Sequence, residues 1–391
     1  MLTSLALIFL TGMVLGRLAQ GLRLPALLGM LIAGILLGPC GLDLLDPSVL
    51  NISADLRQLA LIIILTRAGL NLDLRDLKQV GRPAVLMCFV PACLEIGGMV
   101  LIAPRLLGVS LLDAAIMGAV TAAVSPAVIV PKMLRLMEEG YGQEHSIPQM
   151  ILAGASVDDV FVIVIFTSLT GLAQGGSLSP AAFLQIPVAI VTGVLAGLVA
   201  GTAFAAFFRR FHLRDSAKVV VLLSISFLLV ALESAVKGRF PFSGLLAVMA
   251  CGMAARRRPD MARRLAAKYA KLWVAAEVLL FVLVGAAVDV GYAAAAGPAA
   301  IAVILGALLF RMAGVFLCML GTPLSRRERL FCMIAYTLKA TVQAAIGSIP
   351  LSLGLPCGQM VLTVAVLAIL ITAPLGAFGV DMTYRRLLAG R

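Results

Sequence analysis

Long apolar runs recur along the whole chain and limit it to one class of fold. Of its 391 residues, 62% are hydrophobic and only 13% are charged, and the mean hydropathy is +1.09. Runs of about 20 apolar residues are long enough to cross a bilayer as helices. The sequence does not show the alternating ten-residue segments of a transmembrane barrel. It therefore predicts an all-α polytopic membrane protein surrounded by lipid.

Thirteen stretches qualify as membrane spans, and we expect residues 1–391 to form a single transmembrane domain with no soluble regulatory domain. They cover residues 2–20, 24–39, 53–71, 83–104, 110–132, 147–173, 181–208, 217–236, 240–255, 271–291, 297–320, 328–350 and 357–379. The first stretch lacks the basic region of a signal peptide, so it counts as a span.

Lysine and arginine are distributed unevenly between the two sets of loops. With the N-terminus outside, the inner loops and the C-terminal tail hold 24 basic residues and the outer loops hold four. Since basic loops stay in the cytoplasm, this bias predicts an outside N-terminus and a cytoplasmic C-terminus in a plasma membrane, which in a bacterium is the inner membrane. The net charge of +12 thus reflects orientation, and no nucleic-acid partner is expected.

Two adjacent carboxylates, Asp158 and Asp159, lie in the middle of the apolar stretch 147–173. One aspartate at the centre of a membrane helix costs roughly 2.5–3.5 kcal/mol on insertion scales. The pair therefore indicates an ion or proton site whose compensating partners lie elsewhere in the chain. The plainer alternative is that the two aspartates only pair with basic residues to hold helices together, although neutral polar groups would do this at lower cost.

Charges of the opposite sign also occur at membrane depth. Arg311 and Lys339 fall near the centres of the eleventh and twelfth spans, and Glu95 lies within the fourth. Because buried charges of opposite sign tend to pair, we expect Arg311 and Lys339 to compensate the buried acids, with Glu95 as the third member of this charge-compensating set. The sequence leaves open whether Arg311 or Lys339 pairs with Asp158.

Two spans carry polar and helix-breaking residues where a lipid-facing helix would be apolar. Pro126 follows Ser125 in the fifth span, and the twelfth span contains Lys339, Thr341 and Gln343. Interrupted helices at matching places of two inverted halves are typical of a transporter site at the membrane midplane. We therefore expect an inverted repeat in which spans one to six (1–173) correspond to spans eight to thirteen (217–379), with 181–208 as a linker helix and helices five and twelve crossing.

These features resemble the monovalent cation:proton antiporter superfamily, and within it the thirteen-span bacterial sodium/proton antiporters with a double aspartate. The resemblance rests on the broken fifth span, the Asp158-Asp159 pair, the basic residue of span eleven and the glycine-rich second span (27–39), and it covers essentially the whole chain.

The resemblance implies secondary active exchange of a cation, foremost Na⁺, for H⁺ by alternating access, in the service of pH homeostasis. Asp159 would bind cation and proton in turn, and Asp158 would be held by Arg311. Thr121 and Ser125, with backbone carbonyls, would lie near the ion, and the protein would form a homodimer. Many such members carry lysine in place of Arg311. Arginine stays protonated, which puts an electrogenic two-proton stoichiometry in doubt.

The residue types fit this chemistry independently of the resemblance. A hard monovalent cation prefers oxygen ligands. Asp159 and Asp158 offer carboxylates, and Ser125, Thr121 and Ser156 offer hydroxyls. A carboxylate that holds either a proton or a cation gives exchange directly, so we expect no enzymatic activity and no cofactor beyond the transported ion.

Three other functions stay open on the sequence alone. A K⁺/H⁺ antiporter and a sodium-coupled transporter of small solutes could share this fold. An intramembrane aspartyl protease would need its two aspartates on facing helices, whereas Asp158 and Asp159 are adjacent on one helix. The sequence also leaves open the choice among Na⁺, Li⁺ and K⁺, the stoichiometry and the working pH.

Overall fold

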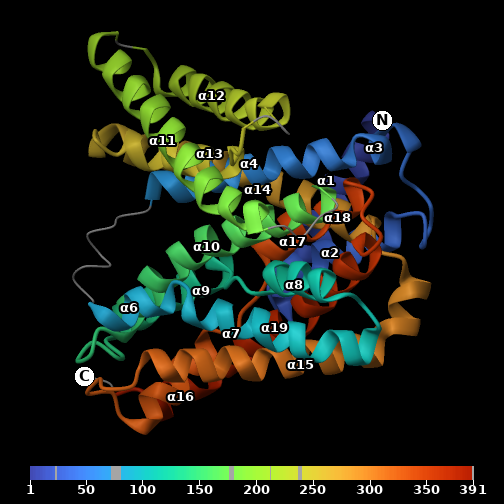
Figure 1. Cartoon of the computed structure of the whole chain (residues 1–391), viewed down its shortest axis with the longest axis vertical. Coiled ribbons are helices and arrows are strands. Elements are labelled where there is room, and N and C mark those ends of the chain that lie inside the picture. Colours follow the sequence, from blue (N-terminus) through green and yellow to red (C-terminus); the bar gives the residue numbers. More distant parts are fainter. Residues whose placement is uncertain (23, 72–80, 176–179, 212, 237–239, 390–391) are drawn as a thin grey trace. The chain divides into compact units, whose positions relative to one another are not determined.

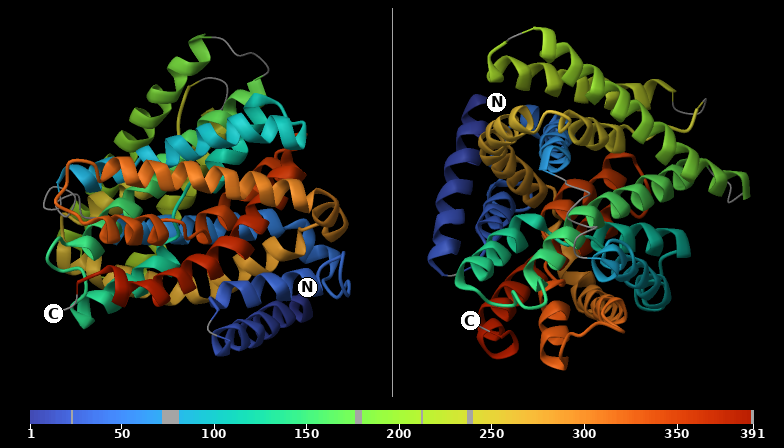
Figure 2. Two further views of the ribbon diagram at one scale, coloured as in Figure 1. Left: turned by 90° about the horizontal axis from the view of Figure 1, so that it is seen from below. Right: turned by 90° about the vertical axis from the view of Figure 1, so that its left-hand side faces the viewer.

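The computed structural model describes residues 1–22, 24–71, 81–175, 180–211, 213–236 and 240–389, which form helices and no strands (Figures 1 and 2). In chain order they are α1 (Leu2–Gly21), α2 (Ala26–Leu37), α3 (Pro47–Asn51), α4 (Ser53–Asn71), α6 (Arg82–Met87), α7 (Val90–Leu107), α8 (Leu111–Thr121), α9 (Pro126–Glu139), α10 (Ile147–Gly175), α11 (Pro180–Arg210), α12 (Asp215–Val236), α13 (Gly244–Ala255), α14 (Pro259–Ala286), α15 (Val290–Cys318), α16 (Arg326–Ala335), α17 (Thr341–Gly347), α18 (Ile349–Ser352) and α19 (Gly358–Leu387).

The prediction of an all-α polytopic membrane protein is confirmed. Among the described residues, eight helices are long and apolar enough to cross a membrane, and α2, α8 and α13 are shorter apolar helices. Each of the thirteen expected ranges overlaps a helix or an interrupted set of helices. The number of membrane crossings and the inverted repeat remain predictions.

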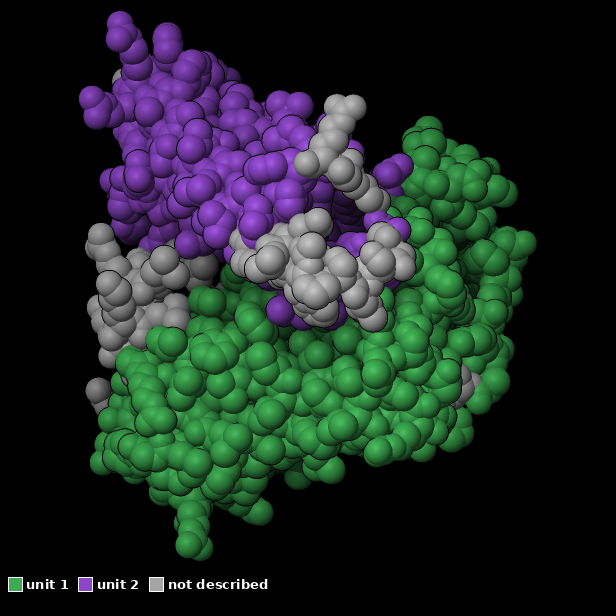
Figure 3. All heavy atoms as spheres, viewed as in Figure 1, with its two compact units in different colours: residues 1–54, 74–162, 278–391 green, residues 55–73, 163–277 purple. Residues whose placement is uncertain are grey.

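The chain folds into two compact units, coloured separately in Figure 3. Unit 1 comprises residues 1–54, 74–162 and 278–391, and unit 2 comprises residues 55–73 and 163–277. The helices α4, α10 and α14 each contribute residues to both units. All the site residues proposed from the sequence belong to unit 1.

The helix α14 differs most from its expected range. The tenth span was expected over 271–291, but α14 begins at Pro259 and ends at Ala286. Its basic first half is rich in alanine and arginine, which favour helix, and it buries Met261, Leu265 and Tyr269 within unit 2. The helix therefore starts well before the apolar run does.

The fifth and twelfth spans are both interrupted. Residues 122–125 are unwound between α8 and α9, and residues 336–340 are unwound between α16 and α17. Pro126 occupies the first position of α9, where its missing N–H costs nothing. The backbone N–H of Ser125 donates to the carbonyl of Leu338 at 2.9 Å, so the two unwound segments lie side by side.

The helices α7 and α15 pack closely because each has a glycine at the contact, where the other helix presents its backbone or an aromatic ring. A Cβ atom added to Gly314 would lie 2.7 Å from Cα of Pro91, and one added to Gly98 would lie 2.7 Å from the ring of Phe310. Such contacts are shorter than any side chain tolerates, so only glycine fits there. This close approach brings Glu95 of α7 and Arg311 of α15 together.

Several contacts join loops that the basic-residue count assigns to the same side of the membrane. In unit 1, the N-terminal amine lies 3.6 Å from Asp46, and Lys132 lies 2.6 Å from Asp381. In unit 2, Arg264 lies 2.8 Å from Asp215. These pairs support the sorting of the loops into two sets.

Candidate ion-binding site

Asp158 and Asp159 lie in the first half of α10 and differ in their surroundings. Asp158 is fully buried, and its Oδ2 accepts hydrogen bonds from the guanidinium of Arg311 at 2.8 Å and from the backbone N–H of Val124 at 3.0 Å. Asp159 is 8% exposed and forms no ion pair with a described residue, and its Oδ1, like the Oδ1 of Asp158, has no hydrogen-bond partner among them. Adjacent helical residues point about 100° apart, which explains how one aspartate is paired while its neighbour is not.

Arg311 projects from α15 into the centre of this cluster, where it is completely buried. Besides Asp158, its guanidinium contacts Glu95 at 3.0 Å. It also donates to the carbonyls of Ala122 and Tyr336, the latter at 2.7 Å. A planar guanidinium with five N–H donors can serve four acceptors in this way, whereas an ammonium group has only three donors.

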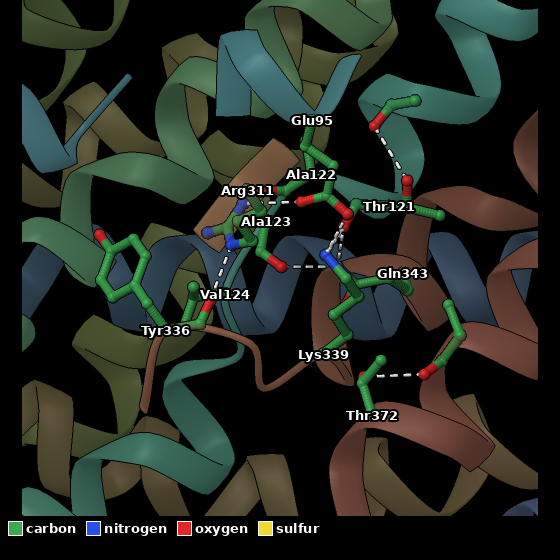
Figure 4. A network of polar contacts seen from close by, with 12 residues as sticks. Glu95, Thr121, Ala122, Ala123, Val124, Arg311, Tyr336, Lys339, Gln343 and Thr372 are labelled. Atoms are coloured by element: carbon green, nitrogen blue, oxygen red, sulfur yellow. Dashed lines mark hydrogen bonds and ion pairs between the residues drawn. The ribbon is translucent and has the colours of Figure 1, made fainter. Parts of the chain in front are cut away.

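Lys339 lies in the unwound segment between α16 and α17 and is also buried. Its Nζ contacts Glu95 at 2.6 Å and donates to the carbonyl of Thr121. The structure thus pairs Arg311, not Lys339, with Asp158. Glu95 bridges the two basic side chains (Figure 4). The sequence alone could not separate the two candidates, since they lie at similar depth.

Three consecutive backbone carbonyls at the end of α8 accept hydrogen bonds from side chains. The carbonyl of Thr121 accepts hydrogen bonds from Lys339 and Gln343. The carbonyl of Ala122 accepts one from Arg311, and that of Ala123 accepts one from Gln343 (Figure 4). Carbonyls at a helix C-terminus lack intrahelical partners and carry partial negative charge, so cationic side chains satisfy them well. The sequence places Gln343 in the polar twelfth span but predicts no role for it, because a neutral amide carries none of the burial cost that marks a charged side chain.

The hydroxyls proposed as ion ligands have other partners or lie outside the description. The hydroxyl of Thr121 donates back into α8, to the carbonyls of Met117 and Gly118. The hydroxyl of Ser125 lies 3.2 Å from that of Thr341, across the two unwound segments. The side chain of Ser156 lies outside the described residues.

The charges of this cluster do not cancel. Glu95, Asp158 and Asp159 are acidic, and Arg311 and Lys339 are basic, so the fully ionised cluster carries one negative charge in excess. Asp158 and Glu95 have basic partners, which leaves the excess on Asp159. A buried unpaired charge is costly, and either a proton or a monovalent cation would neutralise it.

Comparison with known proteins assigns nearly the whole chain to one family. The family model described as "Sodium/hydrogen exchanger, transmembrane" matches residues 5–385. The chain belongs to this sodium/hydrogen exchanger family. Mouse sodium/hydrogen exchanger 9B2 is 35% identical over 381 residues, covering 93% of this chain and 69% of the relative. Human sodium/hydrogen exchanger 9B1 is 32% identical over 399 residues, covering 96% and 76%.

The fold of this exchanger matches a solved antiporter. The sodium proton antiporter MjNhaP1 from Methanocaldococcus jannaschii, at pH 8, superposes with a TM-score of 0.86 at 21% identity, covering 99% of this chain and 98% of that one. The family match and the exchanger 9B relatives, together with this fold, confirm the sequence prediction of the antiporter superfamily. Family and fold together identify a multi-pass membrane transporter, and cation/proton antiport is the activity that they support.

Proposed function

We propose that this exchanger carries Na⁺ in one direction and H⁺ in the other, with Asp159 binding the cation and the proton in turn. The observation that carries the proposal is the excess negative charge of the buried cluster, which falls on Asp159 because this carboxylate, unlike Asp158 and Glu95, forms no ion pair with a described residue. A group that must be neutralised by one monovalent ion at a time gives obligatory exchange when it is exposed alternately to the two sides.

Asp158 has a different role in this proposal. The hydrogen bonds that it accepts from Arg311 and from the N–H of Val124 favour its ionised form, so in this proposal it contributes negative potential to the site while Asp159 exchanges the proton. Arg311 remains charged throughout the cycle. Lys339 forms an ion pair with Glu95 and not with Asp158. Asp159 is then the one group of this proposal that exchanges a proton. We infer that one cation is exchanged for one proton and that transport is electroneutral.

The orientation and assembly belong to the same proposal. The bias of basic residues supports an outside N-terminus and a cytoplasmic C-terminus in the plasma membrane. The homodimer rests on the family resemblance. Chemical cross-linking of the protein in membranes would test the dimer separately from the transport activity.

The substitution Asp159→Asn tests the proposed exchange. It keeps the shape of the side chain but removes its charge, so we expect normal membrane insertion and no exchange. The measurement is dequenching of a pH-sensitive dye in everted vesicles on addition of Na⁺, Li⁺ or K⁺, with the wild type alongside. Undiminished dequenching in Asp159→Asn would exclude this role of Asp159. Dequenching of the wild type with K⁺ alone would show that the transported cation is K⁺ and not Na⁺.

A further inference from the structure

Gln343 joins the two unwound segments of unit 1 through one buried amide. The side chain is fully buried in α17. Its Nε2 donates to the carbonyls of Ala123 at 2.8 Å and Thr121 at 3.2 Å, and its Oε1 accepts from the backbone N–H of Ala340 at 2.8 Å. Both N–H groups of the amide therefore donate a hydrogen bond, and its oxygen accepts one. If the amide were turned over, its oxygen would face two carbonyls and its N–H groups would face a backbone N–H.

The segment that Gln343 holds also orients Asp158. Val124 directly follows Ala123, and its N–H donates to Asp158 at 3.0 Å. A shift of this segment would move the Val124 N–H away from the carboxylate and would leave Arg311 as its remaining donor. The amide of Gln343 therefore acts on the aspartate pair through two residues of backbone, without touching either carboxylate.

Gln343 differs from the other side chains that bind these carbonyls. Arg311 and Lys339 reach Ala122 and Thr121, but both also balance the charge of buried carboxylates. The amide of Gln343 is neutral, so a neutral substitution leaves the charge of the cluster unchanged. An effect of such a substitution on cation binding then does not come from a change in the net charge of the cluster.

We propose that Gln343 is a positioning residue for cation binding: it fixes the crossing of the unwound segments 122–125 and 336–340 and so keeps the Val124 N–H on Asp158. The inference rests on the proposed function, since it assigns the role of Gln343 at the same site. Preorganised partners of an ion-binding group typically contribute about 10–100-fold in affinity.

Two substitutions test the role, with one matched control. Gln343→Met keeps the length of the side chain and removes its hydrogen bonds, whereas Gln343→Asn keeps the amide but is too short to reach all three partners. The control is Thr372→Val. Thr372 is also buried, in α19, and among the described residues its hydroxyl donates only into its own helix, to Ala368 at 2.7 Å. Cation-dependent exchange in proteoliposomes gives KM and kcat, and thermal melting in detergent reports folding.

We expect Gln343→Met to raise the KM for the cation about tenfold, with a much smaller change in kcat, and Gln343→Asn to give an intermediate KM. Thr372→Val should retain the wild-type KM. If Gln343→Met does not fold, the Asn variant decides. A wild-type KM in the folded variants, with only kcat or the melting temperature lowered, would overturn the positioning role. Absence of exchange in the wild type would instead overturn the proposed function.

Discussion

Arg311 is the residue on which the buried charges of unit 1 depend most. It is fully buried, contacts both Asp158 and Glu95, and donates to two backbone carbonyls of the unwound segments. Removing one partner of a buried ion pair leaves an uncompensated charge, which is far more costly than the net contribution of the pair itself. The identity of this one residue therefore affects stability as well as transport.

We predict that Arg311→Ala lowers the free energy of unfolding by about 3–5 kcal/mol, because Asp158 loses its charged partner and Glu95 loses one of two. Arg311→Lys should lose less, since it keeps the charge but not the planar group that reaches four acceptors. Thermal melting in detergent measures both. Equal melting temperatures for the wild type and Arg311→Ala would contradict this account of the cluster.

The residues most visible in the sequence were those whose burial is expensive. Asp158, Asp159, Arg311, Lys339 and Glu95 all stood out as charges at membrane depth, and the structure brings Glu95, Asp158, Arg311 and Lys339 into one network. Which charge contacts which could not be predicted, because depth along a span does not specify rotation about the helix axis.

At the scale of elements, the interruptions of the two polar spans place the site. Pro126 marks the start of α9 in the sequence itself, so the first break was predictable. The second has no proline within 336–340, and the signal there was the cluster of polar residues around Lys339. Neither pattern predicted that side chains donate hydrogen bonds to the carbonyls at the end of α8, because these bonds depend on how the two unwound segments lie relative to each other.

The close packing of α7 against α15 gives a prediction for Gly314. In Gly314→Ala the new methyl group meets the backbone of Pro91, which cannot rotate away, so the helices must separate next to Arg311 and Glu95. Overpacking of this kind costs about 1–3 kcal/mol, and we expect both the melting temperature and the exchange rate to fall.

The matched control for this prediction lies on α7. Gly97 is exposed, and a Cβ atom added there meets no other atom within 4 Å. Gly97→Ala should therefore leave exchange unchanged and stabilise the helix by up to about 1 kcal/mol. If Gly314→Ala behaved like Gly97→Ala, the close approach of the two helices would not be required for the site.

The end of α9 is joined to the C-terminal helix α19 by a pH-dependent contact. Glu139 accepts hydrogen bonds from Arg135 at 2.6 Å and from the hydroxyl of Tyr384 at 3.1 Å, and the hydrogen bond from Arg135 is the main reason that the pKa of Glu139 lies below its usual value. A lowered pKa in the folded state means that the stabilisation is present above the unfolded pKa of about 4.3 and is lost as the pH falls through the folded pKa.

We therefore predict that the melting temperature of the wild type falls on acidification below about pH 4.3 more steeply than that of Glu139→Gln, which cannot lose a charge there. Melting curves in detergent over an acidic pH series measure the difference. Parallel curves for the two proteins would show that this contact contributes nothing to acid sensitivity.

At the scale of the whole molecule, the orientation in the membrane can be tested with a native cysteine. Cys40 is exposed and follows α2, in the loop that the count of basic residues places outside. We predict that a membrane-impermeant maleimide labels Cys40 in intact cells and that Cys40→Ser removes this labelling. Labelling of Cys40 in everted vesicles alone would reverse the orientation.

The class of the molecule followed from composition, since only helices satisfy their backbone in a bilayer over so many apolar stretches. The division into two units did not follow from it. Unit 2 collects residues 55–73 and 163–277, which are far apart in the chain, and its boundaries fall within α4, α10 and α14. A hydropathy pattern describes each span separately and carries no record of which spans pack together.

The central claim is that Asp159 exchanges one proton for one cation, and proton release on cation binding tests it most directly. Na⁺ is added to the detergent-solubilised protein in weakly buffered solution over a series of pH values, and the protons released are counted. We predict about one proton per chain for the wild type and none for Asp159→Asn, because binding of a cation to a protonated carboxyl must displace its proton. Equal release from the two proteins, or no release from the wild type at any pH, would contradict the claim.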